Sequence, residues 1–180
     1  MKISRLTKKI GIYFVGNISS KLLTILLIPI YAYYISSTDL GQYDFIQSLM
    51  NITVIIAYIA IWEAILRFLL GEKDEKMKKN IISTSVIFVL VVSLLLTIIV
   101  YFYFRLKTPY PFLSSLMIMF YGIAQIWQYY ARALEKNIIY MQACIISIFV
   151  NFTGAIIFIC ILKLGLLGLI LSYLMGRVSV

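Results

Sequence analysis

The sequence predicts an all-α protein, a polytopic bundle of transmembrane helices with five complete spans and a truncated sixth. Of its 180 residues, 63% are hydrophobic and only 13% are charged, and the mean hydropathy is +1.00. Soluble globular proteins have far more charge and less apolar surface. The apolar residues also fall into blocks of about 20 to 27 residues, the length that a helix needs to cross roughly 30 Å of hydrocarbon.

Six helices are expected from these blocks and from the residues between them. The expected ranges are 10–34, 42–70, 80–104, 111–133, 138–162 and 164–180, the last being cut off at the chain end. Thr38 or Asp39 can cap the second helix, Gly71 can end it, and Pro111 suits a first helical turn. The first block runs to Tyr34 and is too long for a signal peptide, so it is expected to remain as a helix. Short connections make neighbouring helices antiparallel and leave no room for an inserted soluble domain.

Cationic residues are sorted by loop, which predicts the orientation of the chain. With a cytoplasmic N-terminus, three cations (Arg105, Lys107 and Lys163) fall outside, and Lys21 falls near neither end. The remaining twelve fall inside: Lys2, Arg5, Lys8, Lys9, Arg67, Lys73, Lys76, Lys78, Lys79, Arg132, Lys136 and Arg177. The positive-inside rule therefore places the N-terminus in the cytoplasm. Because the net charge of +9 is distributed in this way, nucleic acid is not expected as a partner.

Residues for enzymatic or metal chemistry are scarce. The chain has no His and only two Cys, so a zinc or haem site is not expected. Cys144 and Cys160 lie in one apolar block, about 24 Å apart on a helix, and cannot pair with each other. The sequence also lacks a phosphate-binding glycine loop, a nucleophile elbow and a carboxylate pair placed for acid–base chemistry. The sequence therefore predicts no enzyme and no cofactor, other than a proton or sodium ion for coupling.

Lys21 is predicted to lie near the bilayer midplane, because it follows Ile10 by about 17 Å of helix. A cation there costs about 3 kcal/mol on insertion scales and usually faces a bundle interior or a wet cavity. Asn17, Lys21 and Thr24 share one helix face. In the alternative, the helix starts near Ser19 and the Lys21 side chain extends to the membrane surface.

The second expected helix carries charged residues at its inner end. Glu63 and Arg67 have the i,i+4 spacing that favours an ion pair. Arg67 suits either a functional role or a positive-inside anchor, whereas Glu63 is a candidate for a proton or cation relay. Near the outer end, one polar face could line an outward-facing mouth, but contact between helices is the favoured role. That face consists of Asp44, Gln47, Ser48 and Asn51.

The helix over 111–133 ends in AQIWQYYARALEK, where Gln125, Gln128 and Arg132 form one polar stripe flanked by aromatic residues. Amides beside aromatic rings are typical of sugar-binding surfaces. The alternative is an aromatic belt at the inner membrane boundary, with Arg132 as an anchor.

Several segments in this order resemble the bacterial oligosaccharide flippases, the Wzx-type polysaccharide biosynthesis family. The segments are KLLTILLIPIYAYYISSTDLGQYD, EAILRFL, KKNIIST and QYYARALEKNIIY. The resemblance extends over essentially the whole chain and includes the wider superfamily of MATE antiporters and the lipid II flippase. It implies two lobes around a central cavity, of which this chain would be an incomplete N-terminal lobe, and a lumen-facing cation at Lys21.

The resemblance implies export of undecaprenyl-pyrophosphate-linked oligosaccharide across the bacterial cytoplasmic membrane by alternating access. Under this hypothesis the cargo contacts are Lys21, Asn17, Arg67, Gln125 and Gln128, and Glu63 couples transport to an ion gradient. The expected partners are the lipid-linked oligosaccharide, membrane lipids and other polysaccharide assembly proteins. A MATE-type multidrug antiporter, a glycan polymerase subunit and a non-transporting scaffold of the same pathway remain as alternatives.

Overall fold

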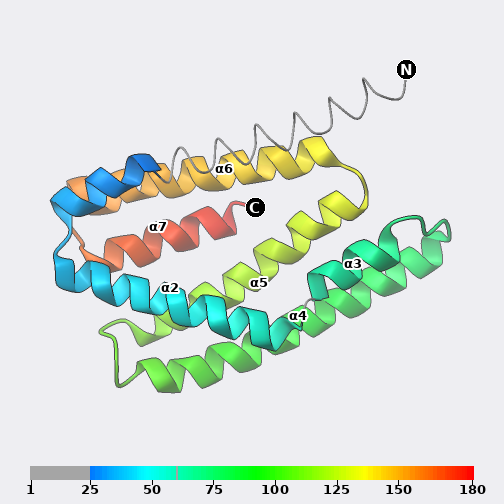
Figure 1. The fold of residues 1–180 in the computed structure, drawn as a ribbon, viewed down its shortest axis with the longest axis horizontal. Helices are drawn as coiled ribbons and strands as arrows, with labels where there is room; N and C mark the ends of the chain where they lie inside the picture. The colour runs from blue at the N-terminus through cyan, green and yellow to red at the C-terminus, as the bar shows by residue number, and fades with distance from the viewer. Residues whose placement is uncertain (1–24, 60) are drawn as a thin grey trace.

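The computed structural model describes residues 25–59 and 61–180, and this part of the chain consists of helices joined by short turns, with no β-strand. Figure 1 shows elongated helices lying side by side, with α7 between α6 and α2. A short helix, Ile25–Tyr34, precedes them. The others are α2 (Ser37–Tyr58), α3 (Ile61–Leu69), α4 (Glu75–Phe104), α5 (Pro111–Ala133), α6 (Asn137–Ala155), the π-helical η1 (Ile156–Ile161) and α7 (Leu166–Val178). The predicted all-α class is confirmed.

Two helices of the described residues are long and apolar enough to cross a membrane: α4, and α6 continued by η1. The pair α2 and α3 gives a third span if the bent pair counts as one. The five complete spans predicted from the sequence are therefore not confirmed. One reason is that α5, although 23 residues long, carries serine, glutamine and tyrosine side chains that lower its hydropathy. Another is that most of the first predicted span, 10–34, lies outside the described residues.

The second predicted helix, 42–70, differs from the structure at its start and in its middle. It begins at Ser37, because the Ser36 hydroxyl accepts a hydrogen bond from the Asp39 amide at 3.1 Å; the predicted caps Thr38 and Asp39 lie inside the helix. It is also divided, since Ile59 has left-handed backbone geometry (φ 47°) and the axes of α2 and α3 differ by 49°. The predicted end is confirmed, with Gly71 at φ 89° just beyond α3.

The other boundaries lie closer to the predictions. Helix α5 has the predicted range, with Pro111 at its first position. Helix α4 begins five residues earlier than predicted, because the Asp74 carboxylate accepts a hydrogen bond from the Lys76 amide at 2.9 Å and caps the helix there. The fifth predicted helix corresponds to α6 and η1 together.

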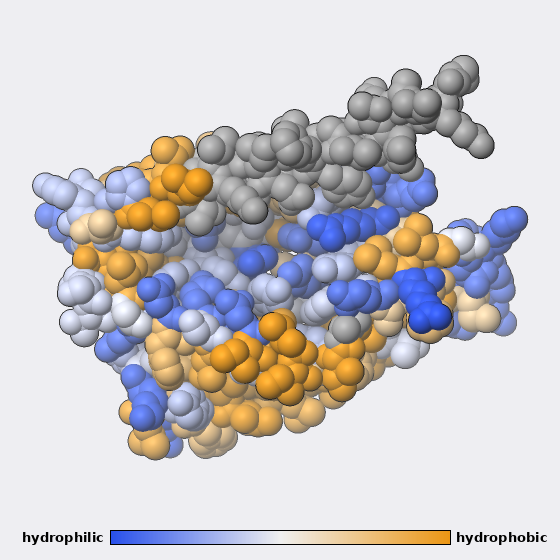
Figure 2. Space-filling model, in the orientation of Figure 1, coloured by the Kyte–Doolittle hydropathy of each residue, from blue (hydrophilic) through white to orange (hydrophobic). Residues whose placement is uncertain are grey.

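The helices pack most extensively as the pairs α4 with α5 and α6 with α7. The main core contains large buried side chains from α2, α4, α5 and α7, among them Tyr58, Phe104, Met117 and Ile170. On the face drawn in Figure 2, apolar side chains cover the lower part and a band of polar side chains crosses the middle, between α2 and α6. A polar band in the middle of an apolar bundle indicates a functional surface.

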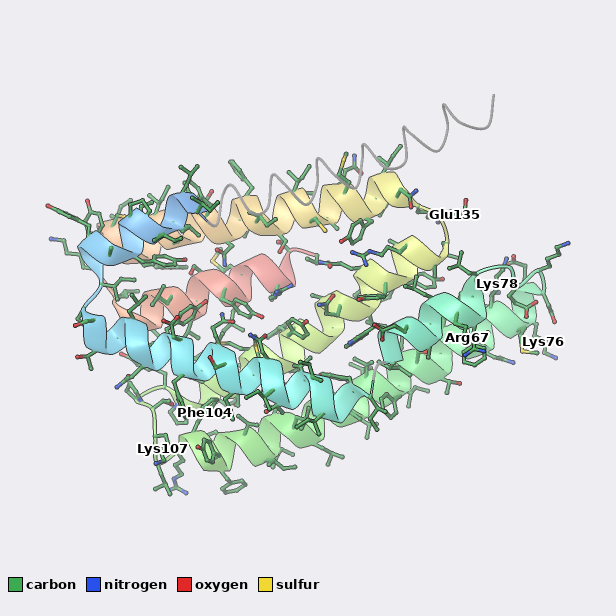
Figure 3. All side chains as sticks on the ribbon, viewed as in Figure 1. Arg67, Lys76, Lys78, Phe104, Lys107 and Glu135 are labelled. Atoms are coloured by element: carbon green, nitrogen blue, oxygen red, sulfur yellow. The ribbon has the colours of Figure 1, made fainter. Side chains whose placement is uncertain are left out.

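Charged side chains gather at the two ends of the bundle. Arg67, Lys76, Lys78 and Glu135 lie at one end and Lys107 at the opposite end (Figure 3). This agrees with the sorting of cations along the sequence, while the assignment of one end to the cytoplasm stays a prediction.

Candidate functional site

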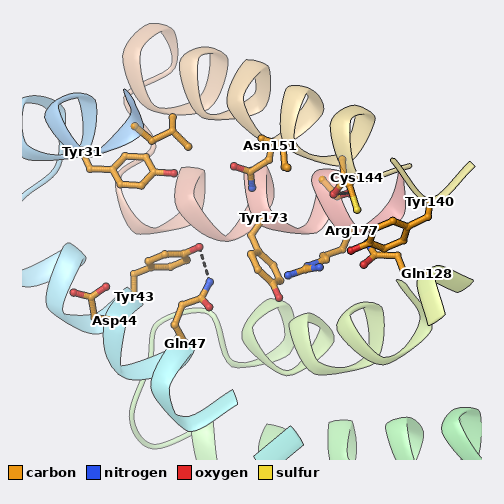
Figure 4. A pocket seen from close by; sticks show the side chains of 14 residues that line it. Tyr31, Tyr43, Asp44, Gln47, Gln128, Tyr140, Cys144, Asn151, Tyr173 and Arg177 are labelled. Carbon is orange, nitrogen blue, oxygen red and sulfur yellow. Dashed lines mark hydrogen bonds between the residues drawn. The ribbon is translucent and has the colours of Figure 1, made fainter. Parts of the chain in front are cut away.

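A chamber of about 560 Å³ opens in the polar band, between the helix Ile25–Tyr34, α2, α5, α6 and α7 (Figure 4). Each of these helices contributes polar side chains to its wall. They are Tyr31, Tyr43, Asp44, Gln47, Gln128, Tyr140, Cys144, Ser147, Asn151, Tyr173 and Arg177. Its volume lies within the range of about 300 to 1,000 Å³ typical of small-molecule sites.

Of the described residues in the chamber wall, Arg177 is the one that carries a positive charge. It follows the start of α7 at Leu166 by eleven residues, about 17 Å of helix, and the backbone of its neighbour Gly176 contacts Ser147 in the middle of α6. Its Cζ atom lies 5.0 Å from the centroid of the Tyr121 ring and 5.1 Å from that of Tyr173. Among the described residues no carboxylate forms an ion pair with it. A half-buried cation without an ion-pair partner is a candidate residue for binding anions.

Hydrogen bonds between side chains and backbone shape the wall around this arginine. On α2, Gln47 Nε2 donates to the Tyr43 hydroxyl at 2.7 Å, since the two residues are one turn apart (Figure 4). The Ser147 hydroxyl of α6 donates to the backbone oxygen of Gly176 at 2.6 Å and ties α6 to α7 beside the chamber. A Cβ atom at Gly176 would lie 2.8 Å from that of Asn151, so glycine allows this close approach.

The structure brings together only part of the predicted site. Gln128 lines the chamber, as a cargo contact would. Gln125 does not line it, and its side chain donates to the Tyr121 hydroxyl at 2.7 Å. Lys21 and Asn17 lie outside the described residues, so their predicted roles stay predictions.

The charged pair of the second predicted helix lies elsewhere. Glu63 and Arg67 are exposed on α3, neither lines the chamber, and no ion pair joins them. By contrast, Asp44 and Gln47, for which contact between helices was the favoured role, line the chamber. These two residues of α2 line the chamber because α2 lies beside α7 with open space between the polar side chains of the two helices.

Sequence reasoning missed Arg177, which it counted among the inside cations. The signal was available, because thirteen residues separate Arg177 from the expected helix start at Leu164, too few for a full span. Tyr43, Asn151 and Tyr173 were also missed, since a single tyrosine or asparagine in an apolar block does not reveal which side of its helix is covered.

Thiol and carboxylate groups in the described part of the chain form no cluster of three that could bind a metal ion. Cys144 lines the chamber as a free thiol, and Cys160, also free, belongs to η1 and does not. Among the described residues, the chamber wall thus offers one cation at Arg177, one carboxylate at Asp44, amides and hydroxyls, and the guanidinium with its neutral donors is a set suited to an oxyanion with attached hydroxyl groups.

The known family of polysaccharide biosynthesis proteins matches residues 6–180, almost the whole chain. The chain belongs to this family. The resemblance predicted from its sequence segments is therefore confirmed. Comparison with curated proteins gives no match, and neither does comparison with solved structures.

Membership of the polysaccharide biosynthesis family, together with the apolar helices, indicates a membrane protein involved in polysaccharide synthesis or export. Such proteins are generally of the transporter type, which is consistent with a non-enzymatic role. The polar chamber has to be interpreted within that setting.

Proposed function

We propose that the chamber binds the head of an undecaprenyl-pyrophosphate-linked oligosaccharide and that the protein takes part in flipping it across the bacterial cytoplasmic membrane. Family membership supports a role in polysaccharide assembly. The observation that carries the more specific proposal is the position of Arg177, a cation beside the middle of α6 in a chamber whose other described wall residues are neutral or, at Asp44, acidic.

Arginine suits this role because its planar guanidinium donates two parallel hydrogen bonds to phosphate oxygens. The attraction is stronger in the low-dielectric surroundings of an apolar bundle than in water. Gln47, Gln128 and Asn151 would hydrogen-bond sugar hydroxyls, with tyrosine rings supplying the apolar faces that sugars also contact. The polyprenyl chain would stay in the lipid.

The size of the chamber bears on how much cargo it takes. About 560 Å³ is suited to the pyrophosphate and the first sugars, and further sugars would extend beyond the opening. In this proposal residues 1–180 act as the N-terminal lobe of a two-lobe flippase, and rocking of the lobes exposes the chamber to each side in turn.

The sequence-based roles of four residues remain part of the proposal. Lys21 and Asn17, which lie outside the described residues, would extend the cargo site, and Arg67 would attract the anionic head at the inner end. For coupling to a proton or sodium gradient, Glu63 is the candidate from the sequence and Asp44 of the chamber wall is its competitor.

A multidrug antiporter is the second candidate, favoured by Asp44 and the tyrosines in the chamber wall, which suit organic cations. Arg177 argues against it, because like charges repel inside a low-dielectric cavity. An efflux assay with ethidium separates the two functions. Export of ethidium that is abolished by Asp44→Asn and unaffected by Arg177→Gln would favour the antiporter.

Substitution of Arg177 tests the proposed function directly. Export of a fluorescent undecaprenyl-pyrophosphate disaccharide is measured in proteoliposomes holding the full chain. Arg177→Gln should lower the export rate about tenfold or more. Arg177→Lys should retain part of the export rate, because lysine keeps the positive charge but lacks the two parallel donors of the planar guanidinium. Arg105→Gln, an exposed position after α4, is the control. Unchanged export by a well-folded Arg177→Gln protein would overturn the proposal.

A further inference from the structure

Gln125 shares a helix face with Gln128, yet its side chain does not line the chamber. Its Nε2 atom instead donates a hydrogen bond of 2.7 Å to the hydroxyl of Tyr121, one turn earlier on α5. The Tyr121 ring in turn lies beneath the Arg177 guanidinium, with 5.0 Å between the ring centroid and Cζ. Gln125 is thereby linked to the cation of the chamber through a single aromatic ring.

The second ring in contact with Arg177 is held in a comparable way. Tyr173 lies 5.1 Å from the Arg177 Cζ atom, is buried, and donates from its hydroxyl to Met50 Sδ at 3.5 Å. Figure 4 shows the Tyr173 and Arg177 side chains next to each other in the chamber. Both rings beneath the cation are therefore fixed by side chains from outside the chamber.

We propose that Gln125 and Tyr121 are positioning residues, which hold Arg177 in the orientation that binds an oxyanion and do not themselves touch the cargo. The inference rests on the proposed function and specifies how the same site obtains its affinity. It replaces the role of Gln125 as a sugar contact, which the sequence suggested.

The physical reason lies in the flexibility of arginine. A free arginine side chain has many rotamers, and fixing them on binding costs affinity. Contact with the face of a tyrosine ring restricts the guanidinium but neutralises no charge, so the attraction for an oxyanion is kept. A guanidinium held in place before the ligand arrives loses less freedom for each hydrogen bond that it forms.

Arg132 shows what the alternative, structural use of such contacts looks like. Its Cζ atom lies 5.0 Å and 4.2 Å from the ring centroids of Tyr129 and Tyr140. Its guanidinium also donates to the Tyr140 hydroxyl, which ties α5 to α6, and Arg132 does not line the chamber. Arg177 has ring contacts too, but it faces open space.

Binding of farnesyl diphosphate to the purified full chain in detergent tests the inference, with farnesol as the uncharged probe. We expect Arg177→Gln to weaken diphosphate binding about tenfold, and Gln125→Ala and Tyr121→Phe to weaken it about three- to fivefold. Gln125→Ala should cause no further loss in an Arg177→Gln background, because there is then no cation to position. Farnesol affinity should stay constant throughout.

The matched controls are Gln142→Ala, exposed on α6, and Tyr130→Phe, on α5 outside the chamber wall. An equal loss from Gln125→Ala with and without Arg177 would overturn the positioning role, as would a fall in thermal stability with unchanged diphosphate affinity. If Arg177→Gln itself left diphosphate binding unchanged, the proposed anion site would fail and not merely the positioning pair. If Arg177→Gln retained diphosphate binding and Gln125→Ala lost it, Gln125 would contact the ligand directly, which would overturn the positioning role.

Discussion

The hydroxyl of Tyr58 lies 2.6 Å from the hydroxyl of Ser93, and this hydrogen bond joins the last residue of α2 to the middle of α4. Both side chains are almost completely buried, with exposed fractions of 1% and 0%. Tyr58 also immediately precedes the left-handed Ile59, where the chain bends into α3. The bond therefore fixes the end of α2 at the point where the helix is interrupted.

Tyr58→Phe is expected to destabilise the protein by about 1 kcal/mol, since hydrogen bonds between membrane helices average about 0.6 and reach about 1.7 kcal/mol. Ser93 would lose its partner, although a helical serine can also donate to the carbonyl four residues earlier, as Ser85 does to Ile81 at 2.7 Å. Unfolding in mixed micelles with increasing SDS measures the effect. In the Tyr58→Phe, Ser93→Ala double variant the loss should be smaller than the sum of the single losses, and an additive result would contradict a direct bond.

Gly122 of α5 is expected to be intolerant of even one methyl group. A Cβ atom there would overlap the Tyr58 hydroxyl oxygen and lie 2.7 Å from Ser93 Oγ. Because both atoms are held by their mutual bond, Gly122→Ala should cost about 1 to 3 kcal/mol. Gly41→Ala is the matched control, since a methyl group at that position would have no neighbour within 4 Å and alanine favours the helix. Equal stability of the two variants in the same SDS titration would contradict the packing.

Gly165, just before α7, combines backbone strain with a close neighbour. Its φ of 55° and ψ of −127° suit glycine, and a Cβ atom would lie 2.6 Å from an Asp39 carboxylate oxygen. Gly71 has φ 89° with open space around it, so Gly71→Ala measures the strain alone. We expect Gly165→Ala to be the more destabilising by about 1 kcal/mol or more. The effects are compared by thermal unfolding of purified protein. A smaller loss of stability from Gly165→Ala than from Gly71→Ala would show that the Asp39 side chain moves away from the added methyl group at little cost.

Cys144 is expected to react with water-soluble thiol reagents much faster than Cys160, because only Cys144 lines the chamber. Its reaction with an anionic sulfonatoethyl reagent should exceed that with a cationic trimethylammonioethyl reagent of similar size, since Arg177 attracts anions. Mass spectrometry of Cys144→Ala and Cys160→Ala proteins assigns each rate. Arg177→Gln should remove the preference for the anionic reagent. A preference that persists would show that Arg177 is not the source of the positive electrostatic potential in the chamber.

Prediction from sequence succeeded where a local signal decided the structure. Pro111 sets the start of α5 and Gly71 follows the end of α3, because each residue restricts or permits the backbone by itself. The division at Ile59 was missed, since β-branched residues rarely adopt φ of 47° and nothing in the local sequence marks a turn. The preceding residue, Tyr58, contacts Ser93 of α4 and lies against Gly122 of α5, and such long-range contacts are not visible in the local sequence.

The candidate site shows the same contrast between local signals, which the sequence contains, and long-range packing, which it does not. Gln128 was found because its spacing from Arg132 defined a helix face. The chamber itself depends on how α2, α6 and α7 are arranged, which a single sequence does not contain. Polar residues spread over several apolar blocks, such as Gln47, Asn151 and Arg177, form one wall only after the helices have packed.

Ion coupling gives the last prediction, because two carboxylates compete for the role. Glu63, the candidate from sequence, is exposed on α3, whereas Asp44 lines the chamber. A carboxylate that exchanges an ion with the transport site has to share its water-filled space, so the geometry favours a larger effect at Asp44. Export in proteoliposomes is measured with imposed proton or sodium gradients for Glu63→Gln and Asp44→Asn. We expect Asp44→Asn to abolish the dependence on one gradient and to leave basal exchange of cargo intact. Loss of that dependence in Glu63→Gln alone would restore the role that the sequence suggested and would require a path from α3 to the chamber.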